Sequence, residues 1–272
     1  MKNSLSISYY TAPELSPLKL VESAAKLKCK FIGLRLLSNQ PGADEMPLLN
    51  DLSFRKVVKK NMNSLGVYSL DANSLRIIPD SNVSDYLNFF DAAWDLNAKH
   101  VLTTINDNDE NRLMDNLNKF CEEAIQRQLT IDIEFVPWLK VSNLKKTIEI
   151  INKCNFMNVG IALDALHFFR SNSSLDLLKK YSKKHINYFQ ICDAKILNKV
   201  PKTEQLIIEA TKNRLSPGNG DINLKKIIDL LPKNIPFAIE IPQVDKYPEM
   251  DPSIKLEMIV NEVKTYLKSL EI

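Results

Sequence analysis

Four short apolar runs in the second half of the chain each carry an oxygen-bearing side chain near their end. These side chains are Glu134, Asp164, Gln190 and Glu240, and they follow one another at intervals of 30, 26 and 50 residues. Three carboxylates and a neutral amide oxygen form a hard ligand set, which suits Mg²⁺, Mn²⁺ or Co²⁺ better than a thiolate zinc site would. Acids gathered in one buried place also need a cation, because unpaired buried charge is costly. The pattern predicts a site for one divalent metal ion, provided that the fold brings the four run ends together.

The elements that carry these residues are predicted to be parallel strands. The four runs lie at 131–136, 159–163, 186–191 and 237–241, and earlier runs of the same character lie at 5–9, 31–36, 67–70 and 100–105. Segments with helical spacing of apolar residues separate them, at 18–27, 54–65, 83–96, 112–126, 144–154, 175–181, 203–211, 224–231 and 254–270. Eight alternating units predict a single (β/α)8 TIM barrel in which residues 1–272 form one domain. The alternative, an open doubly wound sheet, is disfavoured because no Gly-rich phosphate-binding fingerprint follows the first strand.

A barrel would place the candidate ligands where active sites form, at the carboxyl ends of the strands. Side chains alternate between inward and outward along a strand, so Ala162 points inward if Asp164 does, and Ala238 points inward if Glu240 does. Small residues below an inward carboxylate leave room in the layers of the barrel interior. The sequence therefore fits the packing that the proposed site requires.

Other polar residues have plainer interpretations. His100 starts the fourth strand, at the end of the barrel that serves stability, and is expected to be a structural histidine. Asp132 shares the inward side of its strand with Glu134, as a paired buried acid. Arg35 and Asp71, near the ends of strands two and three, are expected to form a salt bridge. Trp138 follows strand five on the catalytic side and is expected either to stack on a sugar-like ring or to anchor a loop.

Composition restricts the partners and the compartment. Thirty-six Lys and Arg residues against 33 Asp and Glu give a net charge of +3, too little to predict nucleic-acid binding. The four cysteines are scattered and fit a reducing cytosol. No secretory signal is evident, and no run of about 18 apolar residues predicts a membrane span. We expect a cytoplasmic protein that binds a small molecule and neither nucleic acid nor membrane; homo-oligomers are compatible with the sequence.

Five runs, IEFVPW, LDALHF, FQICDA, RLSPGNGDINL and AIEIP, resemble the xylose isomerase-like TIM barrel superfamily. This sugar phosphate isomerase/epimerase group includes 3-dehydroshikimate dehydratase and inosose dehydratase, and the resemblance covers roughly residues 131–242. It implies that Glu134, Asp164, Gln190 and Glu240 bind one divalent ion, with Zn²⁺ as an option beside Mn²⁺, Mg²⁺ and Co²⁺. It also implies that Glu134 and Glu240 act as acid and base on opposite faces of a substrate carbon.

The resemblance also assigns residues that contact the substrate. His167 matches a histidine that contacts a substrate oxygen, and Arg214 matches an arginine that holds a substrate hydroxyl or carboxylate. Asp193, in the run FQICDA, is expected beside the substrate. Two positions depart from the pattern. Gln190 stands where the epimerases more often have histidine, although glutamine recurs in the dehydroshikimate dehydratase branch, and Asn219 stands where glutamate is frequent.

The reaction follows from the site only in outline. A metal that polarises a carbonyl lowers the cost of an enolate, and two glutamates can remove and return a proton. We expect an isomerase or epimerase of a keto-sugar or polyol. The alternatives are a dehydratase of a cyclic keto-polyol, such as 3-dehydroshikimate or an inosose, and an inactive ligand-binding barrel. A nuclease with a histidine-rich zinc cluster is disfavoured by the presence of three histidines in all.

Overall fold

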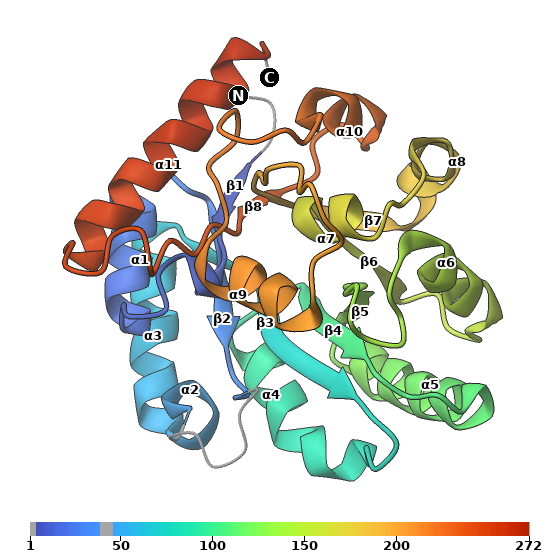
Figure 1. Cartoon of the computed structure of the whole chain (residues 1–272). Helices are drawn as coiled ribbons and strands as arrows, with labels where there is room; N and C mark the ends of the chain where they lie inside the picture. The colour runs from blue at the N-terminus through green and yellow to red at the C-terminus, as the bar shows by residue number, and fades with distance from the viewer. Residues whose placement is uncertain (1–3, 39–45, 272) are drawn as a thin grey trace.

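The protein is a closed barrel of eight parallel strands, which confirms the predicted fold class. The computed structural model describes residues 4–38 and 46–271. Each strand pairs with the next in sequence, and β8 closes the barrel on β1 (Figure 1). The strands are β1 (Leu5–Ile7), β2 (Phe31–Arg35), β3 (Tyr68–Ile77), β4 (His100–Ile105), β5 (Thr130–Ile133), β6 (Val159–Asp164), β7 (Ile186–Ile191) and β8 (Phe237–Ile239).

Helices surround the strands, as Figure 1 shows. They are α1 (Pro17–Lys26), α2 (Pro47–Asn50), α3 (Leu52–Leu65), α4 (Leu87–Asp95), α5 (Glu110–Gln126), α6 (Leu144–Lys153), α7 (Ala165–Arg170), α8 (Leu175–His185), α9 (Thr203–Lys212), α10 (Leu224–Leu230) and α11 (Pro252–Ser269), with short 3-10 helices at Tyr9–Thr11 and Val83–Tyr86. Within the described part of the chain, no helix is long and apolar enough to cross a membrane.

Local signals in the sequence set several helix ends. The carboxylate of Asp51 accepts a hydrogen bond from the backbone N–H of Phe54 at 2.9 Å and starts α3. Gly66 ends that helix with φ +67°, a left-handed conformation that favours glycine. The side chain of Asn143 accepts a hydrogen bond from the N–H of Lys146 at 3.0 Å and starts α6. Asp, Asn and Gly at these positions are residue types that favour the ends of helices.

Two strands stop one residue short of the candidate glutamates, and both glutamates nevertheless stay in register. The backbone N–H of Glu134 donates to the carbonyl of Thr103 at 2.8 Å, and that of Glu240 donates to the carbonyl of Ile191 at 3.3 Å. The preceding strand, β4 or β7, therefore fixes the backbone of each glutamate at the carboxyl end of the barrel. Active sites of β/α barrels form at this end.

The barrel interior below that end is filled by a small cluster of side chains. Its buried members are Leu70, Leu102, Ala162, Tyr188 and Ala238, with Phe31 packed against them. Ala162 and Ala238 thus point inward, as the alternation predicted. The two small residues leave space that the large Tyr188 ring occupies.

The amino end of the barrel contains the partners of the buried acid Asp132. The carboxylate of Asp132 accepts hydrogen bonds from Asn187 Nδ2 and Thr130 Oγ1, each at 2.5 Å, and lies 2.8 Å from His100 Nδ1. Burial opposes protonation of His100, but Asp132 raises the pKa of its imidazole. Gly160 is required beside this cluster, because a Cβ there would lie 2.3 Å from Asn187 Nδ2. His100 and Asp132 are structural.

Candidate functional site

The carboxyl end of the barrel brings together an acid from β6, a glutamate from the end of β5 and a histidine from α7. Ligand atoms of Glu134, Asp164 and His167 all lie within 4.8 Å of one another. The three residues are 9, 1 and 4% exposed. Two of the four predicted ligands therefore meet directly, and His167 joins them.

The other two predicted ligands complete the cluster through an amide. The side-chain amide of Gln190, the residue before the last of β7, interacts with both Glu134 and Glu240, and each interaction opposes the rise in the pKa of the glutamate concerned. Ser8 lowers the pKa of Glu240 in the same way from the end of β1. The two glutamates thus share one amide, as expected of groups placed around one small ligand.

The acids affect one another strongly because they are removed from water. Burial, and then the charges of Asp164 and Glu240, raise the pKa of Glu134 well above its ordinary value. Burial also raises the pKa of Glu240, against the opposing charge of Arg214. Burial works to raise the pKa of Asp164 as well, but Arg214 outweighs it and the pKa is lowered. Such opposed shifts in one cluster are typical of functional sites.

His167 provides a neutral nitrogen ligand beside these acids. Burial lowers the pKa of its imidazole to about 4, so the ring is uncharged at neutral pH. Among the described residues, Nδ1 of His167 and Oε1 of Gln190 are buried without a hydrogen-bond partner. Two unsatisfied acceptor-type atoms beside buried carboxylates fit a divalent cation. Sequence reasoning placed His167 on the substrate; its spacing of three residues from Asp164, in the turn that starts α7, is the signal that could have identified a ligand.

Helix α7 explains how Asp164 is oriented. One oxygen of its carboxylate caps the helix, accepting a hydrogen bond from the N–H of His167 at 2.9 Å. The other oxygen forms an ion pair with Arg214 Nη1. Arg214 also donates from Nε to the carbonyl of Ala210 at 2.8 Å, and its Nη1 lies 3.5 Å from Cys192 Sγ. Arg214 therefore holds this acid in place, and its predicted contact with a substrate stays a prediction.

Asp193 serves the loop that follows α9 rather than an open binding surface. Its carboxylate accepts backbone N–H bonds from Ala194, Gly218, Gly220 and Ile222 at 2.8, 2.9, 3.0 and 3.1 Å. A Cβ on Gly220 would lie 2.2 Å from an oxygen of Asp193, which explains the glycine. With four donors on two oxygens, Asp193 has little capacity left for the substrate contact that the sequence predicted.

Trp138 lies on the rim of the site. Its ring meets that of His167 edge-on, with the ring centres 5.3 Å apart and the planes at 76°. The side chain is partly exposed and packs against the main core. Trp138 therefore buttresses His167, and part of its surface remains available.

The expected salt bridge between Arg35 and Asp71 is wrong. Asp71 accepts a hydrogen bond from the Tyr188 hydroxyl at 2.9 Å, and burial raises the pKa of its carboxyl to about 7. The guanidinium of Arg35 lies over the rings of Tyr9 and Tyr10, 5.3 and 5.5 Å from their centres. The reason is register, because Asp71 pairs with Gly33 in the sheet while Arg35 lies two residues further along β2.

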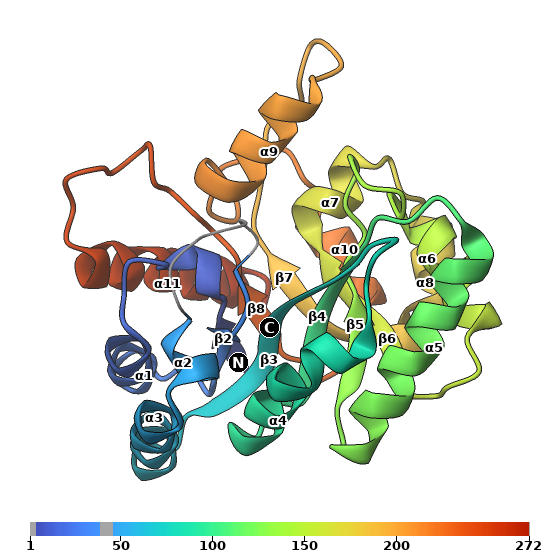
Figure 2. The same ribbon diagram turned by 90° about the horizontal axis from the view of Figure 1, so that it is seen from below.

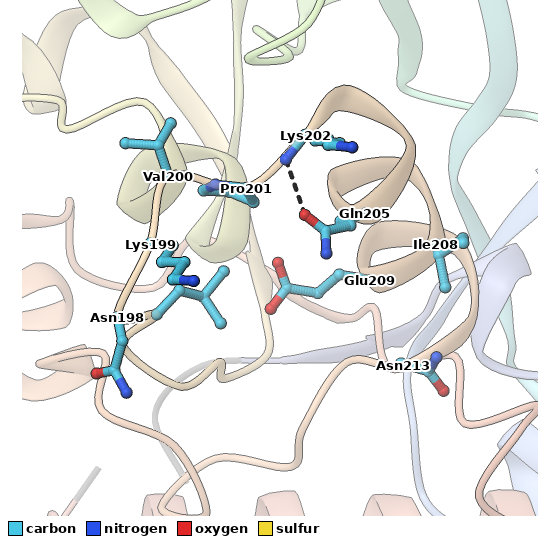
Figure 3. Close-up of a pocket in the computed structure, with 10 residues that line it drawn as sticks. Asn198, Lys199, Val200, Pro201, Lys202, Gln205, Ile208, Glu209 and Asn213 are labelled. Atoms are coloured by element: carbon cyan, nitrogen blue, oxygen red, sulfur yellow. Dashed lines mark hydrogen bonds between the residues drawn. The ribbon is translucent and has the colours of Figure 1, made fainter.

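A separate hollow of about 640 Å³ lies away from this chemistry, between α9 and the loop before it. Figure 2 shows α9 standing out from the barrel, and Figure 3 shows the hollow lined by side chains such as Val200, Lys202 and Glu209. Its walls contain none of the strand-end acids. We therefore place the candidate site at the strand ends and not in this hollow.

The barrel and the cluster together define a β/α-barrel protein with an acid-rich centre at the carboxyl ends of its strands. The chain belongs to the xylose isomerase-like TIM barrel family, whose sequence profile matches residues 21–259. This finding confirms the resemblance identified from the five sequence runs.

Individual relatives narrow the comparison. Inosose isomerase of Bacillus subtilis (strain 168) is 31% identical over 129 residues, covering 46% of this chain and 43% of the relative, so the match spans under half of that protein. A crystal structure of IolI protein with a bound zinc atom has a TM-score of 0.78 at 21% identity, covering 98% of this chain and 97% of the other. The probable 3-DHS dehydratase AsbF from Bacillus anthracis has a TM-score of 0.75 at 13% identity, covering 96 and 98%. At these identities the two structures show a shared fold.

Proposed function

We propose that the protein is a divalent-metal-dependent isomerase or epimerase of a keto-sugar or polyol-type small molecule. The observation that carries this proposal is the pair of buried glutamates, Glu134 and Glu240, that share the amide of Gln190 beside Asp164 and His167. Membership of the xylose isomerase-like TIM barrel family and similarity to an inosose isomerase support this substrate class.

The residues that would hold the metal are Glu134, Asp164, Gln190 and Glu240, with His167 added by the structure. When bound, a divalent ion supplies Lewis-acid stabilisation of negative charge on a substrate carbonyl oxygen. The ion is Mn²⁺, Mg²⁺, Co²⁺ or Zn²⁺ in this proposal, and the zinc atom of the IolI structure supports the last of these.

Glu134 and Glu240 would do the proton transfer. One removes the proton next to the carbonyl, and the other delivers a proton to the opposite face or to the neighbouring carbon. Their raised pKa values bring the two carboxyls closer to neutral pH, where a group can both accept and return a proton. Arg214 keeps Asp164 ionised and therefore available to a cation.

The second candidate is a dehydratase of a cyclic keto-polyol, such as 3-dehydroshikimate or an inosose. Gln190 favours it, since glutamine at this ligand position resembles the dehydroshikimate dehydratase branch. The likeness in fold to a probable 3-DHS dehydratase is compatible with it. Both reactions begin with removal of the same proton, so the acids serve either.

Metal analysis combined with proton NMR in D₂O tests the proposal. Purified protein should carry close to one divalent ion per chain and should exchange the α-proton of a ketose or inosose without loss of water. Formation of a conjugated enone that absorbs in the ultraviolet would select the dehydratase. Neither exchange nor elimination with a panel of ketoses, inososes and 3-dehydroshikimate, using metal-loaded protein, would leave an inactive binding barrel.

A further inference from the structure

Arg35 is a buried cation that lacks an acidic partner among the described residues. It is 8% exposed, and no carboxylate in the described ranges lies within 4.0 Å of its guanidinium. Its Nη1 is buried and forms no hydrogen bond there. An arginine side chain stays charged at any physiological pH, so burial cannot be relieved by loss of a proton. Burying such a charge without a partner is costly.

The side chain points toward the interior of the barrel mouth. Phe31 packs against the interior cluster, and a Cβ on Gly33 would meet Asp71, which bonds to the interior Tyr188. Alternate residues of a strand share a face, so Arg35 lies on the interior side, above Gly33. It is also the last residue of β2 and therefore lies at the catalytic end.

Aromatic rings lie against the guanidinium of Arg35, but its Nη1 has no hydrogen-bond acceptor among the described residues. Tyr9 and Tyr10 lie against it as aromatic partners, which supply attraction but no hydrogen-bond acceptor in that geometry. Asn73, paired with Arg35 in the sheet, has a second buried donor, Nδ2, without a hydrogen-bond partner, although it lies close enough to Asp71 to lower that carboxyl's pKa. Arg35 and Asn73 thus place two hydrogen-bond donors side by side in the barrel mouth, and a negatively charged acceptor would satisfy them.

The position of Arg35 relates it to the proposed chemistry. The ends of β8, β1 and β2 lie side by side and carry Glu240, Ser8 and Arg35 in that order. Ser8 interacts with Glu240, and the next residue, Tyr9, contacts Arg35. Neighbouring strands lie about 4.8 Å apart, so the backbones of β2 and β8 are separated by roughly 10 Å along the barrel wall. A sugar-sized molecule can span that distance.

We propose that Arg35 binds a carboxylate on the substrate. This inference rests on the proposed function and narrows its substrate class to acidic keto-polyols. The planar fork of a guanidinium matches a carboxylate with two parallel hydrogen bonds, and the two tyrosines hold the fork in place. The substrate anion supplies the negative charge that the protein does not supply in the described residues, while the opposite side of the mouth acts on the carbonyl.

Titration calorimetry of metal-loaded protein with two probes tests the inference. 3-Dehydroshikimate is a cyclic keto-polyol with a carboxylate, and scyllo-inosose is a neutral one. Arg35→Gln should weaken binding of 3-dehydroshikimate by about tenfold or more and change binding of scyllo-inosose by less than about twofold. Arg35→Lys, which keeps the charge but loses the fork, should fall in between. Arg76→Gln, at an exposed arginine of β3, is the matched control and should change neither.

Several results would overturn the inference. These are wild-type protein that does not bind 3-dehydroshikimate, equal weakening of both probes by Arg35→Gln, or unchanged affinity in that variant. Should Arg35→Gln fail to fold, Arg35→Lys carries the comparison. Fructose 6-phosphate is a third probe; tighter Arg35-dependent binding of it than of 3-dehydroshikimate would replace the carboxylate with a phosphate ester and reject the assignment.

Solvent exchange measured on the same samples separates this inference from the proposed function. Arg35-dependent binding without α-proton exchange would keep the anion site and reject the isomerase. Exchange of the α-proton of scyllo-inosose, together with unchanged binding of 3-dehydroshikimate in Arg35→Gln, would keep the isomerase and reject the anion site.

Discussion

Arg214 and Asp164 form an ion pair that is almost wholly removed from water, with 3 and 0% of their side-chain surfaces exposed. The pair links the loop after α9 to the end of β6. The charge of the same guanidinium opposes the rise in the pKa of Glu134 and of Glu240, so it is a cation that three acids share. Arg214 thereby supports the charge of the whole site.

Removal of Arg214 should destabilise the fold as well as the site. Arg214→Gln leaves Asp164 buried and unpaired, and breaking one half of a buried pair typically costs about 3–5 kcal/mol. Urea unfolding measures this, with Lys225→Gln as the control. Lys225 pairs with Asp229 on the surface, and a surface pair is worth about 1 kcal/mol or less. A loss for Arg214→Gln no larger than that of the control would contradict the role given to this pair.

His167 should contribute to metal binding. His167→Ala removes a neutral buried imidazole from the cluster and should weaken Co²⁺ affinity by roughly 10–100-fold, followed through the visible spectrum of the ion. Glu134→Gln should weaken it similarly. His185→Ala provides the control, because that ring stacks on Tyr181 in α8, away from the acids. Wild-type Co²⁺ affinity in His167→Ala would return His167 to the role of substrate contact.

Asp71 should make stability depend on pH in a defined direction. Its pKa is about 7 in the fold against an ordinary 3.8, because the carboxyl is buried. Between these values the folded protein holds a proton that the unfolded chain has lost, so stability falls as pH rises. From pH 5 to pH 8 the loss from this group is on the order of 2–3 kcal/mol. In Asp71→Asn, urea unfolding should show a correspondingly smaller decline.

The control for that measurement is Asp115→Asn, at an exposed position of α5. It should keep the decline of the wild-type protein. A decline in Asp71→Asn as large as in the wild type would mean that the Asp71 carboxyl is ionised in the fold at low pH.

Asp193 should stabilise the loop at 216–222, from whose backbone N–H groups it accepts hydrogen bonds. Asp193→Ala leaves four backbone N–H groups without their acceptor and should cost roughly 2–4 kcal/mol. Hydrogen exchange should accelerate at 216–222. Asp221→Asn is the milder comparison, since Asp221 is exposed and accepts one N–H, from Ile196 at 2.8 Å. Unchanged exchange in Asp193→Ala together with a raised KM would support the substrate contact predicted from the sequence.

The parts of this molecule that depend on local pattern could be predicted. The bounds of β4 and β7 coincide with the apolar runs 100–105 and 186–191. The acid-tipped run ends were identified for the same reason, since a strand's inward and outward alternation is visible in its own sequence. Ala162 and Ala238 followed from that alternation and do lie inside.

Features that depend on partners distant in sequence could not be predicted. Strand β3 continues through the polar residues Asp71, Asn73 and Ser74 because β2 and β4 hydrogen-bond to it on both sides. The pairing of Arg214 with Asp164 depends on how a loop returns 50 residues later. Helix α7 has only six residues, too few for a periodic pattern, and its start depends on the Asp164 cap.

The raised pKa values of Glu134 and Glu240 make occupancy of this centre a matter of competition with hydrogen ions. Three acids and one arginine carry a formal charge of minus two, which a single dication balances. Because burial raises the pKa of Glu134 and of Glu240, these two carboxyls bind protons more tightly than free glutamates do, and an entering ion competes with those protons. Loading should therefore acidify an unbuffered solution, and the protein should release its metal progressively as the medium becomes more acidic.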